Sequence, residues 1–477
     1  MAGSLQISPG VELSPSAVKA TLASNYLSNS DFDFMNQYLP DTYEQEFERY
    51  GNRSIASFLR NVSAEIPSAS DLIKWSEQGR LHTKYVEITA DDADGSDTAT
   101  FIINDVDSNG DYLSCTFREN QTVLLSDNAL NLSAKGIVTA TTAPVGSTTP
   151  ATFTVAFYNA GGQPTGFAAS IGITAFVYGS EFKKGTAGMD GSLEAVPDIF
   201  EVKPVIIKDK FEIAGSDMAQ IGWIEVTTEN GATGYLWYVK SEHETRLRFE
   251  DYLEMMMIEG VPTEAGSGAL GVLGAVSGTN GLFNVLETRG NVWSGGNPST
   301  LADFDDIVSR LDKQGAIAEN VLFTNRQFSF DIDDMLAAQN SYGTNGTSYG
   351  LFDNDKDMAL NLGFTGFRRG YDFYKSDWKY LNDATLRGGL VGGAVNGVLI
   401  PAGTTSVYDQ VMGKNMKRPF LHIRYRANEA ENRKFKTWVT GSAGGATNSD
   451  LDAMQVHFLS ERALCTLGAN NFVLFKD

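Results

Sequence analysis

The sequence has few of the residues that build disulfide frameworks and metal centres. Among 477 residues there are two cysteines and four histidines. Cys115 and Cys465 lie far apart without C-x-x-C or zinc spacing, which excludes a disulfide framework and predicts two separate buried thiols in a reducing compartment. The histidines share no ligand spacing and have no nearby cysteine, so we expect packed or surface side chains rather than metal ligands. They are His82, His243, His422 and His457.

Long apolar runs and an excess of positive charge are also missing. No stretch reaches the ~18 apolar residues of a membrane span, and no cationic and then apolar segment follows Met1, so we expect neither a membrane helix nor a signal peptide. The net charge of -22 argues against a molecule that grips nucleic acid over its whole surface, although it does not forbid a place near DNA. With 42% hydrophobic residues, the chain can bury sizeable cores in about two to four structural units.

Signatures of catalysis occur only in contexts that contradict them. GTSYG at 346–350 has the spacing of a nucleophile elbow around Ser348, but it lies in a polar loop instead of between a strand and a helix. GSGALG at 266–271 follows a predicted helix rather than a strand, so it offers no βα turn to a pyrophosphate and is interpreted as a flexible hinge. We therefore predict no enzyme, no catalytic residues and no cofactor.

One segment opens like a calcium loop. Asp105, Asp107, Asn109 and Gly110 have the alternate spacing with which oxygens wrap a hard cation, but the twelfth position is Thr116 instead of glutamate. Because the segment lies between two β-like runs, the simpler interpretation is a hairpin with an Asn-Gly turn. We predict no metal site.

The longest uninterrupted pattern is the stretch from Gly234 to Val261, which has no proline or glycine from Tyr235 to Glu259. Apolar residues recur near one face at the helical period, and charged residues occupy the rest. That apolar stripe comprises Leu236, Val239, His243, Leu247, Leu253 and Met257. Glutamate–arginine pairs at i,i+4 spacing add roughly 1 kcal/mol, which cannot hold such a helix alone. At ~1.5 Å per residue the helix spans about 35 to 40 Å, so we predict a spine with sheet packed along it.

The residues before this spine are predicted to form an arm and an extended loop. Residues 1–79 comprise a polar, serine-rich arm followed by short helices over 40–51, 54–62 and 70–79. Residues 80–233 form the extended loop. Within it, short runs rich in threonine, valine and phenylalanine from 84 to about 178 predict an inserted barrel or sandwich. The loop then continues through a glycine-rich tip, EFKKGTAGMDGS, and a return strand, GWIEV, that leads into the spine.

The spine helix, assigned to residues 234–265, is followed by an α/β domain over 266–440. Helical periodicity at Leu301–Lys313 and around Phe328–Leu336 flanks the buried strand ENVLFTN, which is the alternation of an α/β domain. Residues 441–477 are predicted to close the chain with two antiparallel strands.

A basic stretch stands out from the acidic background. Its cations are Lys414, Lys417, Arg418, Arg424, Arg426, Arg433, Lys434 and Lys436, interleaved with Phe420, Tyr425, Phe435 and Trp438. Contact with nucleic acid is one interpretation. The favoured interpretation is that these cations meet carboxylates of a neighbouring subunit or domain, because the rest of the chain is so acidic.

The order of these parts resembles the major capsid protein of tailed bacteriophages, which has the Hong Kong 97 fold. Four segments look most similar to capsid proteins of crAss-like phages: GYLWYVKSEHETRLRFEDYLEMMM, VLFTNRQFSFDIDDML, GFTGFRRGYDFYKSDWKYLND and HFLSERALCTLGANNFVLF. The resemblance covers nearly the whole chain by order and rests on packing patterns. It implies an α+β fold of N-terminal arm, extended loop, spine helix in a peripheral domain, and axial domain, with the small all-β domain as an insertion.

The resemblance also implies a structural function. Such proteins self-assemble into pentamers and hexamers of an icosahedral head that encloses double-stranded DNA without sequence-specific binding. The implied partners are further copies of the chain and portal, scaffold or auxiliary capsid proteins, without a membrane. The implied location is the virion, after assembly in the cytoplasm of the host bacterium. The inserted β domain would project outward or brace neighbours.

A second interpretation stays open from the residues themselves. The β domain of a ligand- or carbohydrate-binding protein would recognise its target while the rest served as scaffold. That interpretation predicts a monomer whose isolated β domain retains a ligand. An enzyme would need Ser348 or an acidic cleft to be essential.

Overall fold

The computed structural model describes most of the chain after residue 53. The described residues are 5–8, 11–13, 54–56, 58–107, 110–194, 197–219, 226–227, 233–234, 237–273, 278–315, 317–340, 365–390, 392–409, 414–445 and 447–476. The chain divides into two compact units. Unit 1 comprises Met1–Ser57, Ile206–Glu254 and Arg433–Ser460, and unit 2 comprises Phe58–Val205, Met255–Asn432 and Glu461–Asp477.

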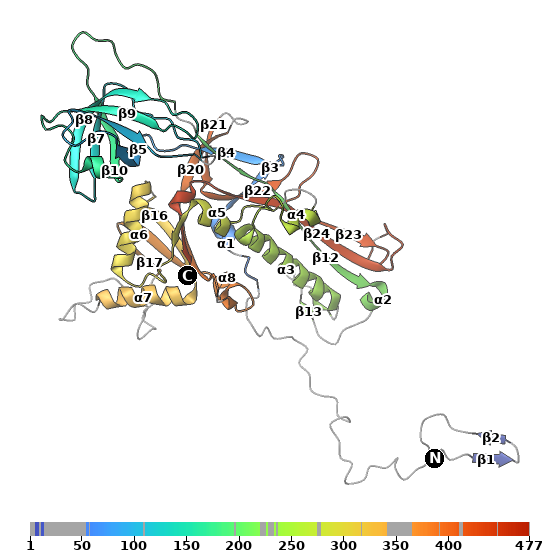
Figure 1. Ribbon diagram of the computed structural model, residues 1–477. Coiled ribbons are helices and arrows are strands. Elements are labelled where there is room, and N and C mark those ends of the chain that lie inside the picture. The colour runs from blue at the N-terminus through green and yellow to red at the C-terminus, as the bar shows by residue number, and fades with distance from the viewer. Residues whose placement is uncertain are drawn as a thin grey trace. The chain divides into compact units, whose positions relative to one another are not determined.

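Unit 1 is built from a long helix against a sheet. Helix α3 (Trp237–Glu259) contributes most of its length to this unit, and the strands are β12 (Val205–Ala214), β23 (Lys436–Gly441) and the first part of β24 (Ala453–Thr466). Figure 1 shows α3 alongside these strands. In β24, Met454, Val456 and Phe458 alternate with polar residues and pack against Phe249 and Leu253 of the helix. The alternate residues of the strand and the residues on one face of the helix therefore share one core.

The prediction of a helix in this stretch is confirmed, and Leu253 and Met257 of the predicted stripe are buried, but the buried face earlier in the helix is rotated from that stripe. Thr245, Phe249 and Leu253 are buried at i,i+4 spacing, whereas Val239 and Leu247 are only half-buried. The rings of Phe435 and Phe458 lie 5.3 and 5.7 Å from that of Phe249, and such clusters add to the burial of apolar area. The partner sheet thus sets the phase of the helix.

Unit 2 contains a six-stranded mixed sheet in the order β15-β25-β19-β16-β18-β17. The strands are β15 (Asn291–Trp293), β16 (Glu319–Thr324), β17 (Gly366–Arg369), β18 (Tyr371–Asp377), β19 (Val395–Pro401) and β25 (Val473–Lys476). β16 pairs parallel with β18 and β15 pairs parallel with β25, while the other pairs are antiparallel. This is the mixed arrangement expected of the predicted α/β segment.

Two helices, α6 (Leu301–Gln314) and α7 (Arg326–Asn340), share one core with this sheet. Phe304, Ile307 and Leu311 of α6 are buried there. A capping box between Thr300 and Asp303 begins α6, and Gly315 ends it in the left-handed conformation at φ 73°. The helices predicted at 301–313 and around Phe328 are therefore confirmed, and Figure 1 shows both beside the sheet.

Residues 84–180 form a closed barrel of six antiparallel strands in the order β10-β5-β6-β9-β8-β7 (Figure 1). The strands are β5 (Lys84–Ala90), β6 (Thr98–Ile103), β7 (Gln121–Asp127), β8 (Leu132–Thr142), β9 (Ala151–Phe157) and β10 (Ile173–Ser180), with the short 3-10 helix η3 (Phe167–Ala169) before β10. Fully buried side chains such as Phe101, Phe153 and Phe167 fill its interior. Between barrel and sandwich, the two predicted forms, the chain adopts the barrel.

The remaining strands pair in short ribbons or join β24. β4 (Ile73–Glu77) pairs with β11 (Asp198–Val202), and β24 pairs with β22 (Leu421–Arg426), which lies parallel to β3 (Ala64–Ser68). The two-stranded ribbons are β1 (Leu5–Ser8) with β2 (Val11–Leu13), β13 (Val226–Thr227) with β14 (Thr233–Gly234), and β20 (Thr404–Asp409) with β21 (Lys414–Pro419). The short helices are α1 (Phe58–Val62), α2 (Gly215–Met218), α4 (Gly268–Leu273), α5 (Leu282–Arg289), α8 (Lys379–Asn382), η4 (Arg387–Gly389) and η5 (Ala469–Asn471).

Three local predictions are wrong. The helix predicted over 70–79 is strand β4, because burial alternates along Ile73–Glu77 and each residue pairs with β11. The β-like run that follows the calcium-like segment, YLSCTF at 112–117, is predicted to form a strand but forms only an isolated bridge between Val106 and Tyr112. The two closing strands exist, but β24 and β25 belong to different sheets instead of pairing with each other, because β19 and β15 flank β25.

Two further predictions fall wholly or mostly outside the described residues. The helix predicted over 40–51 lies entirely outside them. Of the return strand GWIEV, only Val226 is described, as the first residue of β13. The helix predicted over 54–62 exists in a shorter form, α1, which covers Phe58–Val62.

The packing of α3 predicts that Phe249→Ala lowers the free energy of unfolding of unit 1 by about 3 to 5 kcal/mol, because the change leaves a cavity between Phe435 and Phe458. The measurement is the midpoint of urea unfolding by tryptophan fluorescence. Tyr252→Ala is the matched control, since Tyr252 is 42% exposed on the same helix and should change stability by less than about 0.5 kcal/mol. Equal losses in the two variants would contradict this packing.

Candidate functional site

One side chain of α3 holds the segment that follows residues 1–53. The Ser54 hydroxyl and the Ile55 backbone N–H both donate to Oδ1 of Asp251, each at 2.9 Å. Ile55 is 3% exposed. Beside this contact lies a cavity of about 180 Å³ lined by Ser54, Glu244, Leu247, Arg248 and Asp251. Asp251 therefore holds the chain at Ser54 and Ile55, within the segment of short helices predicted after the arm.

The β4–β11 ribbon carries the chain into and out of the barrel. Its register pairs Trp75 with Phe200 and Ile73 with Val202. Ile73 and Val202 are buried with Ala463 and Cys465 of β24, which covers one face of the ribbon. Lys74 and Glu201 form an ion pair at 2.9 Å, with both side chains more than half exposed. On this second face Ile199 is 67% exposed.

The segment between the barrel and the ribbon buries almost nothing. Every residue from 181 to 194 except Met189 is exposed, and Leu193 is 56% exposed. In the segment that enters the barrel, before β5, Leu81 is 92% exposed. Fixing a residue in one backbone conformation costs about 1 to 2 kcal/mol, which burial in this segment does not offset. The predicted extended excursion therefore exists as a segment without a core of its own.

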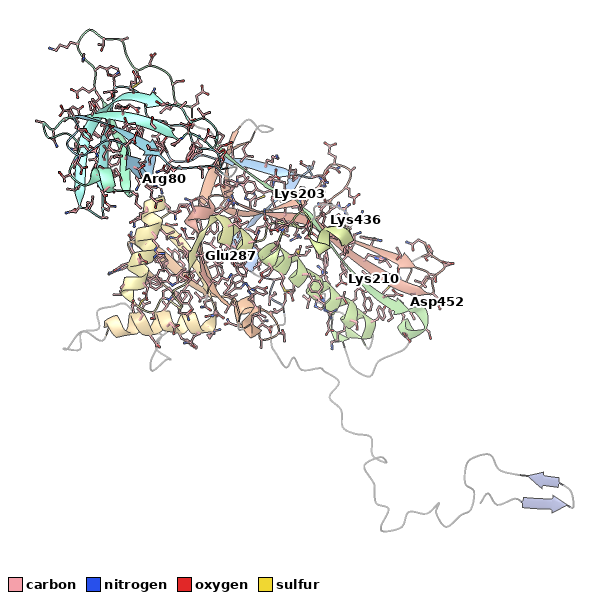
Figure 2. All side chains as sticks on the ribbon, viewed as in Figure 1. Arg80, Lys203, Lys210, Glu287, Lys436 and Asp452 are labelled. Carbon is pink, nitrogen blue, oxygen red and sulfur yellow. The ribbon has the colours of Figure 1, made fainter. Side chains whose placement is uncertain are left out.

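The described part of the basic stretch has partners within the chain. Arg426 binds Asp71, lies 3.3 Å from a Glu461 carboxylate oxygen and donates to the Ala69 carbonyl. The Lys436 ammonium, labelled in Figure 2, lies 5.8 Å from the centre of the Trp438 ring. Arg424, Arg433 and Lys434 also have partners. The side chains of Lys414, Lys417 and Arg418 are outside the described part of the structure. The carboxylates that Arg426 meets therefore belong to its own unit.

The catalytic and metal motifs do not assemble into a site. Ser348 and its GTSYG motif lie outside the described residues. At 266–271 the chain enters the short helix α4 after α3 instead of after a strand, so no βα turn is present there, and the flexible hinge stays a prediction. At the calcium-like segment, the Asp107 N–H donates to the Asp111 carbonyl, as in a turn, while residues 108–109 are not described. Within the described ranges, no group of three histidine, cysteine or acidic side chains could hold a metal ion.

The thiols and histidines do not gather into one site among the described residues. Cys115 and Cys465 form no disulfide, Cys465 is buried and Cys115 is half-buried, and burial raises the pKa of the Cys115 thiol. His457 stacks on Trp438 with ring centres 5.0 Å apart and lies 2.8 Å from the Thr440 hydroxyl. In the part of the chain that the structure describes, no helix is both long and apolar enough to cross a membrane.

A polar cluster that the sequence does not indicate surrounds the end of α3. The Tyr380 hydroxyl donates to Glu259 at 2.7 Å, and Nε of Arg387 lies 3.2 Å from the same carboxylate oxygen. Burial, and then the bond to Glu259, raise the pKa of Tyr380 far above its ordinary value. Next along the chain, a Cβ at Gly260 would lie 2.8 Å from the Thr279 carbonyl oxygen, so only glycine fits where the helix ends. These partners are too distant in sequence for any local pattern to pair them.

The contact at Asp251 predicts that Asp251→Ala speeds hydrogen exchange of the Ile55 amide about tenfold or more, because the amide loses a charged acceptor. Exchange followed by mass spectrometry of the peptide that contains Ile55 measures this. Asp251→Asn is the matched control: it keeps an acceptor oxygen and should give a smaller increase. Unchanged exchange in Asp251→Ala would show that Asp251 does not hold this segment.

No protein-family model and no curated protein matches the sequence. Solved structures do align with it. A chain of Microbacterium phage Oxtober96 aligns over 94% of this chain and 98% of its own, with 11% identity and a TM-score of 0.39. A capsid chain of a native GTA particle aligns over 94% and 98%, with 10% identity and a TM-score of 0.38. The holo-SrpI encapsulin complex from Synechococcus elongatus PCC 7942 aligns over 59% and 76%, with 11% identity and a TM-score of 0.32.

These TM-scores are low, so the function proposed below is argued from the contacts and exposed surfaces of this chain. Two of these similar structures are described as a phage and as the capsid of a GTA particle, and the third as an encapsulin complex.

Proposed function

We propose that the chain is a structural shell protein, the major capsid protein of a bacteriophage head. The observation that carries the proposal is the exposed excursion of residues 181–194, which returns through a ribbon with one uncovered face. Ordered chain without a core of its own gains stability only by burying surface against another molecule. A shell supplies that surface through other copies of the same chain.

The chain's other features fit repeated assembly. Asp251 holds the chain on α3 at Ser54 and Ile55, after the predicted arm, so the arm and the first short helix would extend toward a neighbouring copy from a defined point. Obligate interfaces made by arms and loops bury roughly 2,000 Å² or more. The net charge of -22 keeps packaged DNA from adhering to the shell wall. The barrel, whose interior is filled by side chains, would project outward or brace neighbours.

The finer proposal follows the family resemblance. Copies form the pentamers and hexamers of an icosahedral head that encloses double-stranded DNA without reading its sequence. Portal, scaffold or auxiliary capsid proteins are the further partners. Assembly takes place in the cytoplasm of the host bacterium and the product is part of the virion. The protein has no catalytic role in this account.

The experiment is sedimentation velocity of the purified full chain, with negative-stain microscopy of the same fractions. We expect the wild-type chain to form capsomers, tubes or closed shells. Ile199→Asp should abolish them while changing the stability of the subunit by less than about 0.5 kcal/mol, because Ile199 is 67% exposed within one chain. In an assembled contact the new carboxylate would be buried, which is strongly unfavourable.

Asp198→Asn is the matched control, since it changes an exposed side chain on the same strand without placing a new charge. It should assemble like the wild-type chain. A wild-type chain that stays monomeric under all conditions would contradict the proposed function. Normal particles from Ile199→Asp would instead contradict only the role of the ribbon.

A further inference from the structure

A cavity of about 280 Å³ lies in unit 2 where the ribbon meets α5 and β24. Its volume is close to the ~300 Å³ at which small-ligand pockets begin. The ribbon contributes Trp75, Phe200, Glu201 and Val202, α5 contributes Val285, Thr288 and Arg289, and β24 contributes Leu464 and Thr466. Asn280, two residues before α5, completes the lining. Apolar and aromatic walls thus enclose a few polar groups, which is the composition of a ligand pocket.

Arg289 is the one cation among the lining residues. Its guanidinium carbon lies 3.9 Å from the centre of the Phe200 ring and 5.8 Å from that of Trp75, so aromatic faces support it. Aromatic faces attract the charge but accept none of its N–H bonds. Burial lowers the pKa of Arg289, and the carboxylate of Glu77 opposes this shift.

The donors of Arg289 are poorly satisfied. Nη2 reaches the Thr466 carbonyl only at 3.5 Å, and Nη1 is buried without a hydrogen-bond partner among the described residues. The nearest oxygen of Glu77 lies 3.9 Å from Nη1, beyond hydrogen-bond distance. That same oxygen already accepts from the Trp75 indole at 2.9 Å and from the Gly468 N–H at 3.0 Å. Glu77 therefore offsets the charge of Arg289 without accepting its bonds.

A second donor lines the same cavity. The Thr466 hydroxyl is buried without a hydrogen-bond partner among the described residues, and Thr466 is 1% exposed. A buried unsatisfied donor is costly and rare in native proteins. Two such donors, one charged and one neutral, line a cavity large enough for a small molecule.

We propose that this cavity binds a carboxylate group, with Nη1 of Arg289 and the Thr466 hydroxyl as its donors. The planar guanidinium matches the geometry of a carboxylate. A phosphate dianion fits less well, because Glu77 and Glu201 are close and Arg289 is the one cation in the lining. Trp75, Phe200 and Leu464 would pack against the apolar part that bears the carboxylate.

The probe is benzoate, whose ring suits the aromatic walls, with benzamide as the uncharged comparison. Isothermal titration calorimetry uses the unassembled full chain, so the result does not depend on the proposed shell function. We expect saturable binding of benzoate and at least tenfold weaker binding of benzamide, since hydrogen bonds to a charged group contribute most of the difference.

Three variants assign the donors. Arg289→Gln should weaken benzoate binding about tenfold or more, and Arg289→Lys should restore part of it by keeping the charge. Thr466→Val keeps the shape of the side chain and should weaken binding severalfold, which preserves the test if Arg289→Gln fails to fold. Equal binding of benzoate and benzamide, or no saturable binding of either, would overturn the proposal and leave a cavity that holds water.

The carboxylate has two sources, a small molecule or an acidic side chain from another copy of the chain. Repeating the titration on assembled particles separates them. Particles that still bind benzoate point to a small molecule, whereas particles that exclude it while free subunits bind it point to a side chain. Both results support a carboxylate site.

Discussion

A two-stranded ribbon has two faces, and among the described residues of this chain only one face of the β4–β11 ribbon is covered. The face that carries Ile73 and Val202 packs on β24, while the face that carries Ile199 stays open. The excursion that feeds the ribbon is exposed along residues 181–194. Hydrogen bonds from Arg118 to Gly191 and from Tyr158 to Glu181 tie this segment to the barrel, but it buries almost no apolar surface to offset the entropy of ordering its backbone. The remainder of the fold can be understood as support for this exposed element.

Each unit supplies a rigid base of its own. In unit 1, Phe249 of α3 lies among the rings of Phe435 and Phe458, and Asp251 holds the chain at Ser54 and Ile55. In unit 2, the six-stranded sheet and the helices α6 and α7 share one core. Rigid bases of this kind position a loop or an arm precisely enough for the same contact to be repeated many times.

The sequence was most informative where structure depends on neighbours along the chain. Helix α6 could be predicted because the residues that set its apolar period, its start and its end are neighbours in the sequence. The barrel could be predicted because its strands recur at short spacing along the chain. The register of the buried face of α3 could not, since Phe435 and Phe458 decide it from almost two hundred residues away. Strand β4 was mistaken for a helix because five residues fit either period, and only pairing with β11 decides between them.

The site was less predictable than the fold. Arg289 lies among aromatic side chains from positions far earlier in the chain, and its unsatisfied donors appear only when three segments meet. The exposed excursion was predictable as a glycine-rich loop, but the uncovered face of its ribbon became visible only through the pairing of β4 with β11.

The most direct test of the central claim is an electron cryomicroscopy map of the particles that the full chain forms. The account predicts that Ile199 and the segment of residues 181–194 lie against another copy of the chain, with the open face of the ribbon buried. Particles in which this face points to solvent, or a chain that forms no particles, would contradict it.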